Sequence, residues 1–332
     1  MAVKVFEQCS EVAMGASAIP TAVLHSRLLT DKSVHADLRS HSYLYATSYC
    51  DAFADQPGTG VHRTGVLQIP SSNTSAARLA ELADSYAASG DWLVALSAAE
   101  ASERVGVAIE ESALWVPHAC IINTPQLCRT LLQHPNIEIV TSAATTGWFA
   151  EPTVLATGVT CQTFAGAQYL EVEPVFGQID IVRPVACRLA SISAAIVGNG
   201  YMAPHNGNLS IGATYELSEW RPANATRSNL EHLDEADYEW QSRHRGVRSV
   251  ASDRTPIAGQ LTDLEANPQL NRYVSVGHGS MGTVSSHYCA VLITARLTGE
   301  FAPMASNIQN ALSPHRFRQR QARRGYKLGS SP

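Results

Sequence analysis

Short apolar runs alternate along this chain with longer stretches whose apolar residues have helical spacing. The short runs predict buried or half-buried strands, at residues 3–7, 61–69, 137–140, 153–156 and 272–276. The longer stretches predict helices, at residues 32–53, 75–89, 124–134, 229–243 and 283–298. The pattern indicates a mixed α/β architecture.

Turn-forming residues mark the ends of several of these elements. Thr124 and Pro125 predict the N-cap and the first turn of a helix, and Gly299 predicts the end of the last helix. In the middle of the chain the pattern changes to longer strands interrupted by glycine, as in an antiparallel sheet, at residues 172–181 and 209–215. Residues 199–208, NGYMAPHNGN, predict a hairpin-like turn between them.

Composition is compatible with two lobes that share one chain. The 332 residues are enough for a sizeable core, and a hydrophobic content of 45% is ordinary for a globular protein. Charged residues make up only 16%, so hydroxyl, amide and small side chains must form much of the surface. We find no internal repeat and no low-complexity linker, so we expect the lobes to interleave along the sequence.

Charge is distributed unevenly between the body of the chain and its end. The net charge is −5, yet the last twenty residues contain no acid and six cations, Arg316, Arg318, Arg320, Arg323, Arg324 and Lys327. An acidic body does not attract nucleic acid, so any contact with a polyanion has to be local to this basic tail. Two interpretations stay open, a solvated and partly disordered end or a phosphate-binding segment.

Several classes of protein are disfavoured by the sequence. The seven cysteines are scattered without a C-x-x-C pair, which is typical of reduced thiols in a cytoplasmic protein. The sequence has no apolar stretch of membrane-spanning length and no signal-peptide pattern at its start, so we expect no membrane association. The twelve histidines show no metal-ligand spacing, and we expect no metal site.

The glycine-rich turn GHGSMG, residues 277–282, lies between a predicted strand and a predicted helix. Such a turn directs backbone N–H groups and the positive end of a helix dipole at one point, which attracts anions. The spelling matches G-x-G-x-x-G, but a dinucleotide fingerprint also needs a following strand and an acid about twenty residues on. Glu300 has nearly that spacing, yet no β-branched strand precedes it. A purely structural turn therefore remains an alternative.

The order of the segments resembles one family along nearly the whole chain, the FAD-dependent oxidoreductases of the D-amino-acid-oxidase type. The resemblance rests on VKVFEQCSEVAMGASAIP, LWVPHACIINTPQLCRTLL, TVLATG, NGYMAPHNGNLSIGATYE, RGVRSVASDRTPIAGQL and YVSVGHGSMGTVSSHYCAVLI. Within the family, the segments GASAIPTAVLHSRLL, GVRSVASDRTPIAG and FAPMASNIQNALSPHRFRQRQARRG look like the flavin-dependent half of a bifunctional branch that modifies the wobble uridine of tRNA.

The resemblance implies a Rossmann-like FAD lobe interleaved with an antiparallel-sheet substrate domain. It places the FAD lobe at residues 1–55, 118–165 and 245–315, the substrate domain at 56–117 and 166–244, and the basic tail at 316–332. The implied chemistry is hydride removal from the carbon next to an amine, followed by hydrolysis of the imine. In the tRNA-modifying branch, a carboxymethylaminomethyl group on uridine becomes aminomethyl and glyoxylate leaves.

The resemblance also assigns roles to individual residues. Arg248 matches the Arg that binds the substrate carboxylate, for which a bidentate guanidinium is suited, and Tyr201 matches a Tyr on the substrate side. Glu7 matches the acid that binds the adenosine ribose. The remaining cofactor-binding positions, around the pyrophosphate and the flavin edge, are Gly15, Ala16, Ser17, Gly158, Gly279, Ser280, Met281, Gly282 and Thr283. Each assignment has an alternative. Arg248 could instead form a surface ion pair, Tyr201 could be a core tyrosine, Glu7 an exposed acid, and the glycine-containing segments plain turns.

Two departures from the family pattern bear on the function. The family's first strand and its G-x-G-x-x-G turn lie roughly twenty residues before the ribose acid, whereas Glu7 is the seventh residue here, so we expect the FAD lobe to lack its first βα unit. The stretch between Val140 and Thr153 is also shorter than the family's hairpin.

Three functions remain possible for the chain. The first is oxidation of a modified uridine in tRNA, the second is oxidation of free glycine, sarcosine or a D-amino acid, and the third is a flavin-free remnant with no activity.

Overall fold

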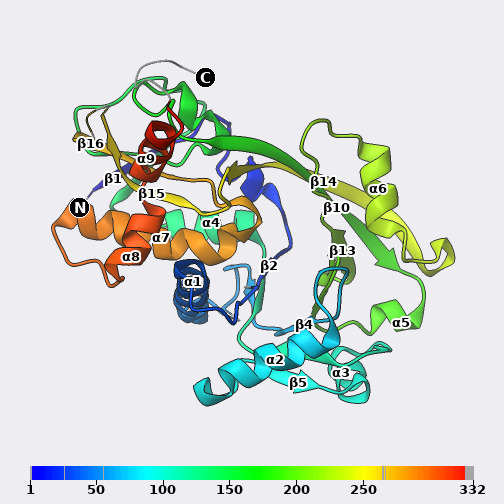
Figure 1. The fold of residues 1–332 in the computed structure, drawn as a ribbon. Helices are drawn as coiled ribbons and strands as arrows, with labels where there is room; N and C mark the ends of the chain where they lie inside the picture. The colour runs from blue at the N-terminus through cyan, green and yellow to red at the C-terminus, as the bar shows by residue number, and fades with distance from the viewer. Residues whose placement is uncertain (1, 26, 55, 264, 266, 326–332) are drawn as a thin grey trace. The chain divides into compact units, whose positions relative to one another are not determined.

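The computed structural model describes residues 2–25, 27–54, 56–263, 265 and 267–325 (Figure 1). It divides into two compact units that interleave along the chain. We call residues 1–30, 47–141 and 176–247 unit 1, and residues 31–46, 142–175 and 248–332 unit 2. The mixed α/β class predicted from the sequence is confirmed, with sheets that are mixed or antiparallel and not closed.

An eight-stranded sheet, in the order β14-β10-β13-β12-β11-β4-β6-β5, forms most of unit 1, and the first residues of β10 (172–175) and the last of β14 (248–251) belong to unit 2. Its strands are β4 (Val66–Gln68), β5 (Val94–Leu96), β6 (Ala113–Val116), β10 (Val172–Pro184), β11 (Ala195–Val197), β12 (Tyr201–His205), β13 (Asn208–Gly212) and β14 (Tyr238–Ala251). Neighbours from β10 to β11 and from β4 to β5 pair antiparallel, whereas β4 and β11 pair parallel. The predicted antiparallel pairing in the middle of the chain is therefore confirmed, whereas the assignment of this sheet to a substrate domain stays a prediction.

Two smaller sheets complete the strands of unit 1. In one, β1 (Val3–Phe6) pairs parallel with β8 (Ile137–Val140). In the other, the order is β2 (Ala22–Leu24), β7 (Cys120–Ile122) and β3 (Val61–His62), and both pairings are antiparallel. The predicted strand over residues 61–69 is thus divided between two sheets, because Gly65 between them adopts φ of +67°.

The helices of unit 1 are positioned by residues that suit their ends. They are α2 (Ala76–Tyr86), α3 (Ala98–Val105), α4 (Thr124–Leu132), α5 (Cys187–Ala190) and α6 (Pro222–Leu230). Ser97 and Glu100 form a reciprocal capping box at the start of α3. Gly106 ends α3 at φ of +78°, and a Cβ there would lie 2.3 Å from the carbonyl oxygen of Ser191, so the position requires glycine.

A buried carboxylate fastens α6 to the sheet. Asp180 of β10 is fully buried, and its Oδ1 accepts hydrogen bonds from Thr226 Oγ1 at 2.8 Å and from Trp240 Nε1 at 2.9 Å. Its Oδ2 accepts from Asn229 Nδ2 at 2.8 Å and from Gln178 Nε2 at 3.0 Å. Two of these donors lie on α6 and one on β14, so the single carboxylate of Asp180 joins β10, α6 and β14.

Unit 2 is built around a three-stranded sheet in the order β15-β16-β9. Strand β15 (Ile257–Thr262) pairs antiparallel with β16 (Pro268–Val276), which pairs parallel with β9 (Thr153–Leu155). Four helices accompany it, α1 (Val34–Asp51), whose first part belongs to this unit, α7 (Gly282–Thr298), α8 (Ser306–Leu312) and α9 (His315–Arg323). Tyr288 and Leu292 of α7 and Ile308 of α8 form part of one buried cluster.

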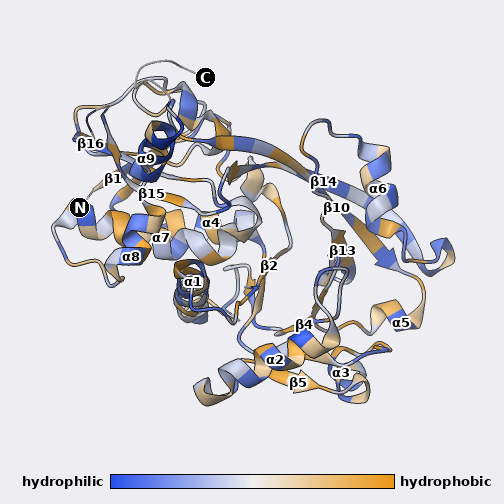
Figure 2. Cartoon of the chain, viewed as in Figure 1, coloured by the Kyte–Doolittle hydropathy of each residue, from blue (hydrophilic) through white to orange (hydrophobic). Residues whose placement is uncertain are grey.

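The basic segment at the end of the chain is folded for most of its described length. Figure 2 shows α9 as largely hydrophilic, yet its Phe317 has 0% of its surface exposed. Arg316 bonds Asp253 at 2.8 Å and Arg320 lies 2.9 Å from Glu171. Of the two interpretations left open, a solvated and partly disordered end is therefore wrong for α9, and Lys327 lies outside the described residues.

Several sequence predictions of local structure also need correction. The helix predicted over residues 229–243 is wrong, since α6 ends at Leu230 and β14 begins at Tyr238. Within residues 199–208, Tyr201–His205 form strand β12 and Asn208 begins β13, so the hairpin turn is confined to Asn206 and Gly207, which both have positive φ. Helix α4 is capped by the Asn123 side chain rather than by Thr124. The first error comes from tertiary pairing, which outweighed local propensity, whereas the cap is a local choice between two neighbouring capping residues.

Three further properties concern the described residues. All seven cysteines are free thiols. No helix in the described part of the chain is both long and apolar enough to cross a membrane. Among the same residues, His, Cys, Asp and Glu side chains form no group of three that is arranged to hold a metal ion.

Candidate flavin and substrate site

The strand-to-helix turn predicted from the sequence is present in unit 2. Strand β16 ends at Val276, the 3₁₀ turn η5 (Gly279–Met281) follows, and α7 begins at Gly282. Gly277 has φ of +74°, and a Cβ there would lie 3.2 Å from Ala251 Cβ and from Ile257 Cγ1. Both the backbone conformation and this close approach require glycine at the first position of the turn.

His278 holds this turn against α7 through two serines. Its Nδ1 lies 2.8 Å from Ser285 Oγ and its Nε2 lies 3.2 Å from Ser275 Oγ. The Ser285 hydroxyl donates to the carbonyl oxygen of Met281 at 2.9 Å, so it must accept from the ring. We infer that Nδ1 carries the proton and that Nε2 accepts from Ser275.

The electrostatics of the turn favour this neutral ring. Burial, together with the nearby His287, lowers the pKa of His278 to about 4. The imidazole is therefore uncharged at pH 7, and it adds no positive charge beside the start of α7. Any attraction for an anion at this point then comes from the backbone N–H groups and the helix dipole.

The carboxyl ends of β9 and β16 lie side by side because these two strands are parallel and adjacent. Leu155 of β9 is in register with Val274 of β16. Gly158 follows β9 at φ of +62°, and a Cβ there would lie 3.7 Å from Ser249 Cβ. Ser249 Oγ also accepts from the backbone N–H of Gly277 at 3.1 Å. Ligands of parallel sheets bind at this edge.

The predicted flavin-edge residues are therefore gathered at one place in unit 2. Gly158 and the turn that holds Gly279, Ser280, Met281, Gly282 and Thr283 both adjoin Ser249 or its neighbours, and Val250 forms a β-bridge with His278. Arg248 precedes Ser249 on β14 and is half-buried. No side chain caps the start of α7, so its first N–H groups suit a ligand with negative character, such as the flavin edge.

Glu7 lies at the carboxyl end of β1 in unit 1. Its backbone N–H donates to the carbonyl oxygen of Val140 at 2.9 Å, which continues the parallel pairing with β8 by one residue. Its carboxylate accepts from the backbone N–H of Cys9 at 2.9 Å and is half-buried. An acid at the end of a parallel strand is the arrangement that ribose binding requires.

The predicted turn at Gly15, Ala16 and Ser17 is a short 3₁₀ turn, η1 (Ala16–Ala18), in unit 1. Gly15 has φ of −82° and nothing within 4 Å of an added Cβ, so packing does not require glycine there. The backbone of β14 approaches closely, since a Cβ on Gly246 would lie 3.2 Å from Ala16 Cα. This close approach explains why residue 246 is glycine. It does not explain the glycine at residue 15, where a side chain would have room.

Tyr201 is fixed by a contact that the sequence did not indicate. Its hydroxyl donates to the carbonyl oxygen of Thr21 at 2.8 Å, and His205 Nδ1 lies 2.6 Å from Thr21 Oγ1. Thr21 is fully buried, so strand β12 is joined firmly to the start of β2. Sequence spacing carried no signal for Thr21 and His205, because 184 residues separate them.

The predicted site residues thus fall into two groups. Unit 1 contains Glu7, Gly15, Ala16, Ser17 and Tyr201, and unit 2 contains Gly158, Arg248, Gly279, Ser280, Met281, Gly282 and Thr283. Their roles remain predictions. Ser249, Ser275 and His278 also shape the site, and their only sequence signal was proximity to Arg248 or to the glycine turn.

Comparison with known proteins identifies the family. Residues 1–296 match the profile of the FAD dependent oxidoreductase family, DAO. The bifunctional protein MnmC of Hahella chejuensis, which acts in tRNA 5-methylaminomethyl-2-thiouridine biosynthesis, is 25% identical over 96% of this chain. MnmC of Stutzerimonas stutzeri is 27% identical over 97%. The chain spans 56% of the length of each of these relatives.

Solved structures give the same fold. Glycine oxidase from Geobacillus kaustophilus superposes with a TM-score of 0.75 at 19% identity, covering 94% of this chain and 91% of that one. L-Proline dehydrogenase from P. horikoshii superposes with a TM-score of 0.70 at 13% identity, covering 96% and 91%. The expectation of a flavoenzyme fold is confirmed, and the protein belongs to the DAO family of FAD-dependent oxidoreductases.

Proposed function

We propose that this protein oxidises the C–N bond of a secondary amine that carries a carboxymethyl group, and that the amine is a carboxymethylaminomethyl-uridine in tRNA. The family supplies the FAD-dependent oxidoreductase activity. The choice of tRNA is supported by the curated relatives, which are named for the biosynthesis of a modified tRNA uridine. Because the chain spans about half of their length, we propose for it only the oxidative step.

The observation that carries the proposal is the edge formed by β9, β16 and α7. Two glycine turns, after Leu155 and after Val276, adjoin the uncapped start of α7. This group of backbone N–H donors fits the N1/C2-carbonyl edge of a flavin, which becomes negative on reduction. FAD bound there would supply an acceptor for two electrons.

The chain's own residues would bind and orient the substrate. Arg248 adjoins this edge on β14, and its planar guanidinium suits a carboxylate, which it would hold by two parallel hydrogen bonds. FAD held at this edge would supply the acceptor for a hydride from the carboxymethyl carbon next to the amine, which would leave an iminium ion. Water then adds to that carbon, and breakage of the C–N bond releases glyoxylate and the primary amine.

The basic helix α9 supplies the proposed contact with tRNA. Arg316 and Arg320 form internal ion pairs, and the Arg318 guanidinium lies 3.8 Å from the centre of the Tyr169 ring. Arg323 and Arg324 at its end are exposed, although Arg324 Nη1 also lies 3.9 Å from Glu171 Oε1, and we assign the phosphate contact to both. Changing both to glutamate should weaken tRNA binding without unfolding the helix.

Mass spectrometry of tRNA nucleosides tests the proposal. The purified protein, supplied with FAD, is incubated with tRNA that contains carboxymethylaminomethyl-uridine. We expect loss of the carboxymethyl group and stoichiometric glyoxylate. If the protein binds flavin but leaves this nucleoside unchanged, the choice of tRNA is wrong. If it remains colourless after incubation with FAD, the alternative of a flavin-free remnant is favoured instead.

The role of Arg248 is tested by kinetics on the same substrate. Arg248→Ala removes a charged, bidentate contact, so KM should rise by roughly tenfold or more. Arg243→Ala is the matched control, because Arg243 lies on the same strand but is exposed and stacks on Trp240. Equal effects of the two changes would refute a carboxylate contact at Arg248.

A second candidate is oxidation of a free amino acid, and the likeness to glycine oxidase favours it. In that case the protein should release peroxide with glycine or sarcosine. Replacing Arg323 and Arg324 by glutamate should then leave the rate unchanged. Peroxide release without any change in the tRNA would select this candidate.

A further inference from the structure

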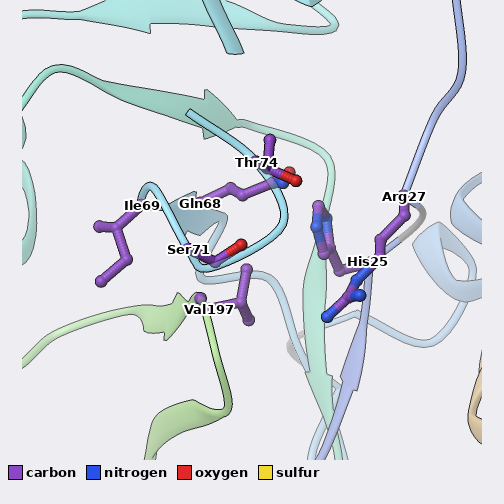
Figure 3. A pocket seen from close by; sticks show the side chains of 8 residues that line it. His25, Arg27, Gln68, Ile69, Ser71, Thr74 and Val197 are labelled. Atoms are coloured by element: carbon purple, nitrogen blue, oxygen red, sulfur yellow. The ribbon is translucent and has the colours of Figure 1, made fainter. Parts of the chain in front are cut away.

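A small polar cavity lies in unit 1 where β2, β4 and β11 end. His25 and Arg27 follow β2, Gln68 ends β4, and Ser71 and Thr74 lie in the loop after it (Figure 3). The volume of the cavity is about 20 Å³. A cavity needs roughly 10–15 Å³ on this scale to hold one water molecule, so this cavity has room for one or two oxygen-sized groups.

His25 indicates that the cavity is meant to hold a polar group. Both of its ring nitrogens are buried, and among the described residues neither has a partner at good hydrogen-bond geometry, although the nearby Gln68 amide acts to raise the pKa of the ring. Buried polar atoms nearly always have a partner, so an unsatisfied pair at a cavity wall points to a ligand. Burial and the neighbouring charge of Arg27 lower the pKa of His25 to about 4, so the ring is neutral at pH 7 and offers one donor.

The rest of the lining favours an anion. Arg27 contributes a guanidinium, Gln68 an amide, and Ser71 and Thr74 hydroxyl groups. None of the described residues that line the cavity is acidic. Within the described part of the chain, the hydroxyls of Ser71 and Thr74 form no hydrogen bond with another side chain. An exposed guanidinium at the rim together with several neutral donors suits a single negative charge.

We propose that this cavity binds the carboxylate of a small acid that has no ammonium group beside it. The two oxygens of a carboxylate match the space, whereas the four oxygens of a phosphate exceed it. Arg27 would repel an ammonium group on the neighbouring carbon, which disfavours an amino acid. The proposal goes beyond the function proposed above, because binding at this cavity requires neither flavin nor tRNA.

Nuclear magnetic resonance of the histidine side chains tests the proposal. The ring nitrogen signals of His25, assigned with His25→Gln, are followed while sodium acetate replaces sodium chloride at constant ionic strength. We expect a saturable shift. Arg27→Gln should weaken acetate binding by roughly tenfold or more. Arg221→Gln, which removes an exposed arginine of the same unit that pairs with Glu219, should leave it unchanged.

Two further measurements protect the proposal against a merely misfolded variant. Thr74→Val keeps the volume of the side chain and removes one donor, so acetate binding should weaken by about threefold or more. Sarcosine, which carries an ammonium group next to its carboxyl carbon, should bind at least tenfold more weakly than acetate. The proposal is overturned if acetate leaves the His25 signal unmoved, if Arg27→Gln matches Arg221→Gln, or if sarcosine binds as well as acetate.

Discussion

Replacing Asp180 by asparagine tests whether one buried carboxylate fastens α6 and β14 to the large sheet. In the wild type, Oδ1 accepts from Thr226 and Trp240, and Oδ2 accepts from Gln178 and Asn229. Asp180→Asn keeps the shape of the side chain. It removes the negative charge and turns one of the two acceptors into an N–H donor.

The structure sets the size of the effect. If the new amide nitrogen faces Trp240, that indole loses its acceptor, because it can only donate. If it faces Gln178, that amide would have to turn over, but its Oε1 is held by Trp220 Nε1 at 3.1 Å. Each hydrogen bond to a charged group contributes about 1.5–3 kcal/mol. With one or two bonds lost, and with Trp240 42% exposed, we expect a loss of about 2–4 kcal/mol.

Urea unfolding measures this loss, followed both by tryptophan fluorescence and by circular dichroism so that coincident transitions can be verified. Glu239→Gln is the matched control. Glu239 lies on β14 and pairs with Arg183 in solvent, so its replacement should change the free energy of unfolding by less than about 1 kcal/mol. A loss of under 1 kcal/mol for Asp180→Asn, or equal losses for both variants, would refute the reasoning.

Three other measurements examine features outside this network. Gly106→Ala should lower the free energy of unfolding by about 2–4 kcal/mol, because φ is +78° and a Cβ would lie 2.3 Å from Ser191 O. Because burial lowers the pKa of His278 to about 4, the unfolded state binds its proton first, so stability should fall between pH 6.5 and 4. In urea unfolding measured at several pH values, the free energy of unfolding of His278→Gln should therefore fall by about 3 kcal/mol less than that of the wild type over this range. A maleimide should label exposed Cys187 in the native protein but not Cys289, since burial raises the pKa of the Cys289 thiol to about 12.

The sequence predicted those parts of the fold that depend on neighbouring residues. Strand 272–276, the glycine turn and the helix that ends at Gly299 were all found, because glycine is required locally at Gly277 and at Gly299. Residues 238–243 were assigned to a helix, whereas they form the start of β14. Trp240 there donates to Asp180, which lies 60 residues earlier, and no local pattern carries that information.

The candidate site was predictable to a similar extent. The resemblance to a family identified Gly158 and the turn at residues 279–283, and the parallel pairing of β9 with β16 brings the ends of both strands to one edge. Sequence could not indicate the contact of Tyr201 with Thr21, because 180 residues separate them. The ion pairs of α9 were missed for the same reason, since a run of arginines looks solvated until its acidic partners are located.

The pairing of β1 and of β9 has a practical consequence for handling the protein. Among the described strands, β1 pairs only with β8 and β9 only with β16, so each leaves one row of backbone N–H and C=O groups unused. Val3, Phe6 and Val154 on these strands are 41%, 37% and 38% exposed. Open edges with apolar side chains are templates for strands of other molecules. We therefore expect the protein to self-associate as its concentration rises, and the net charge of −5 to oppose this only weakly at high salt.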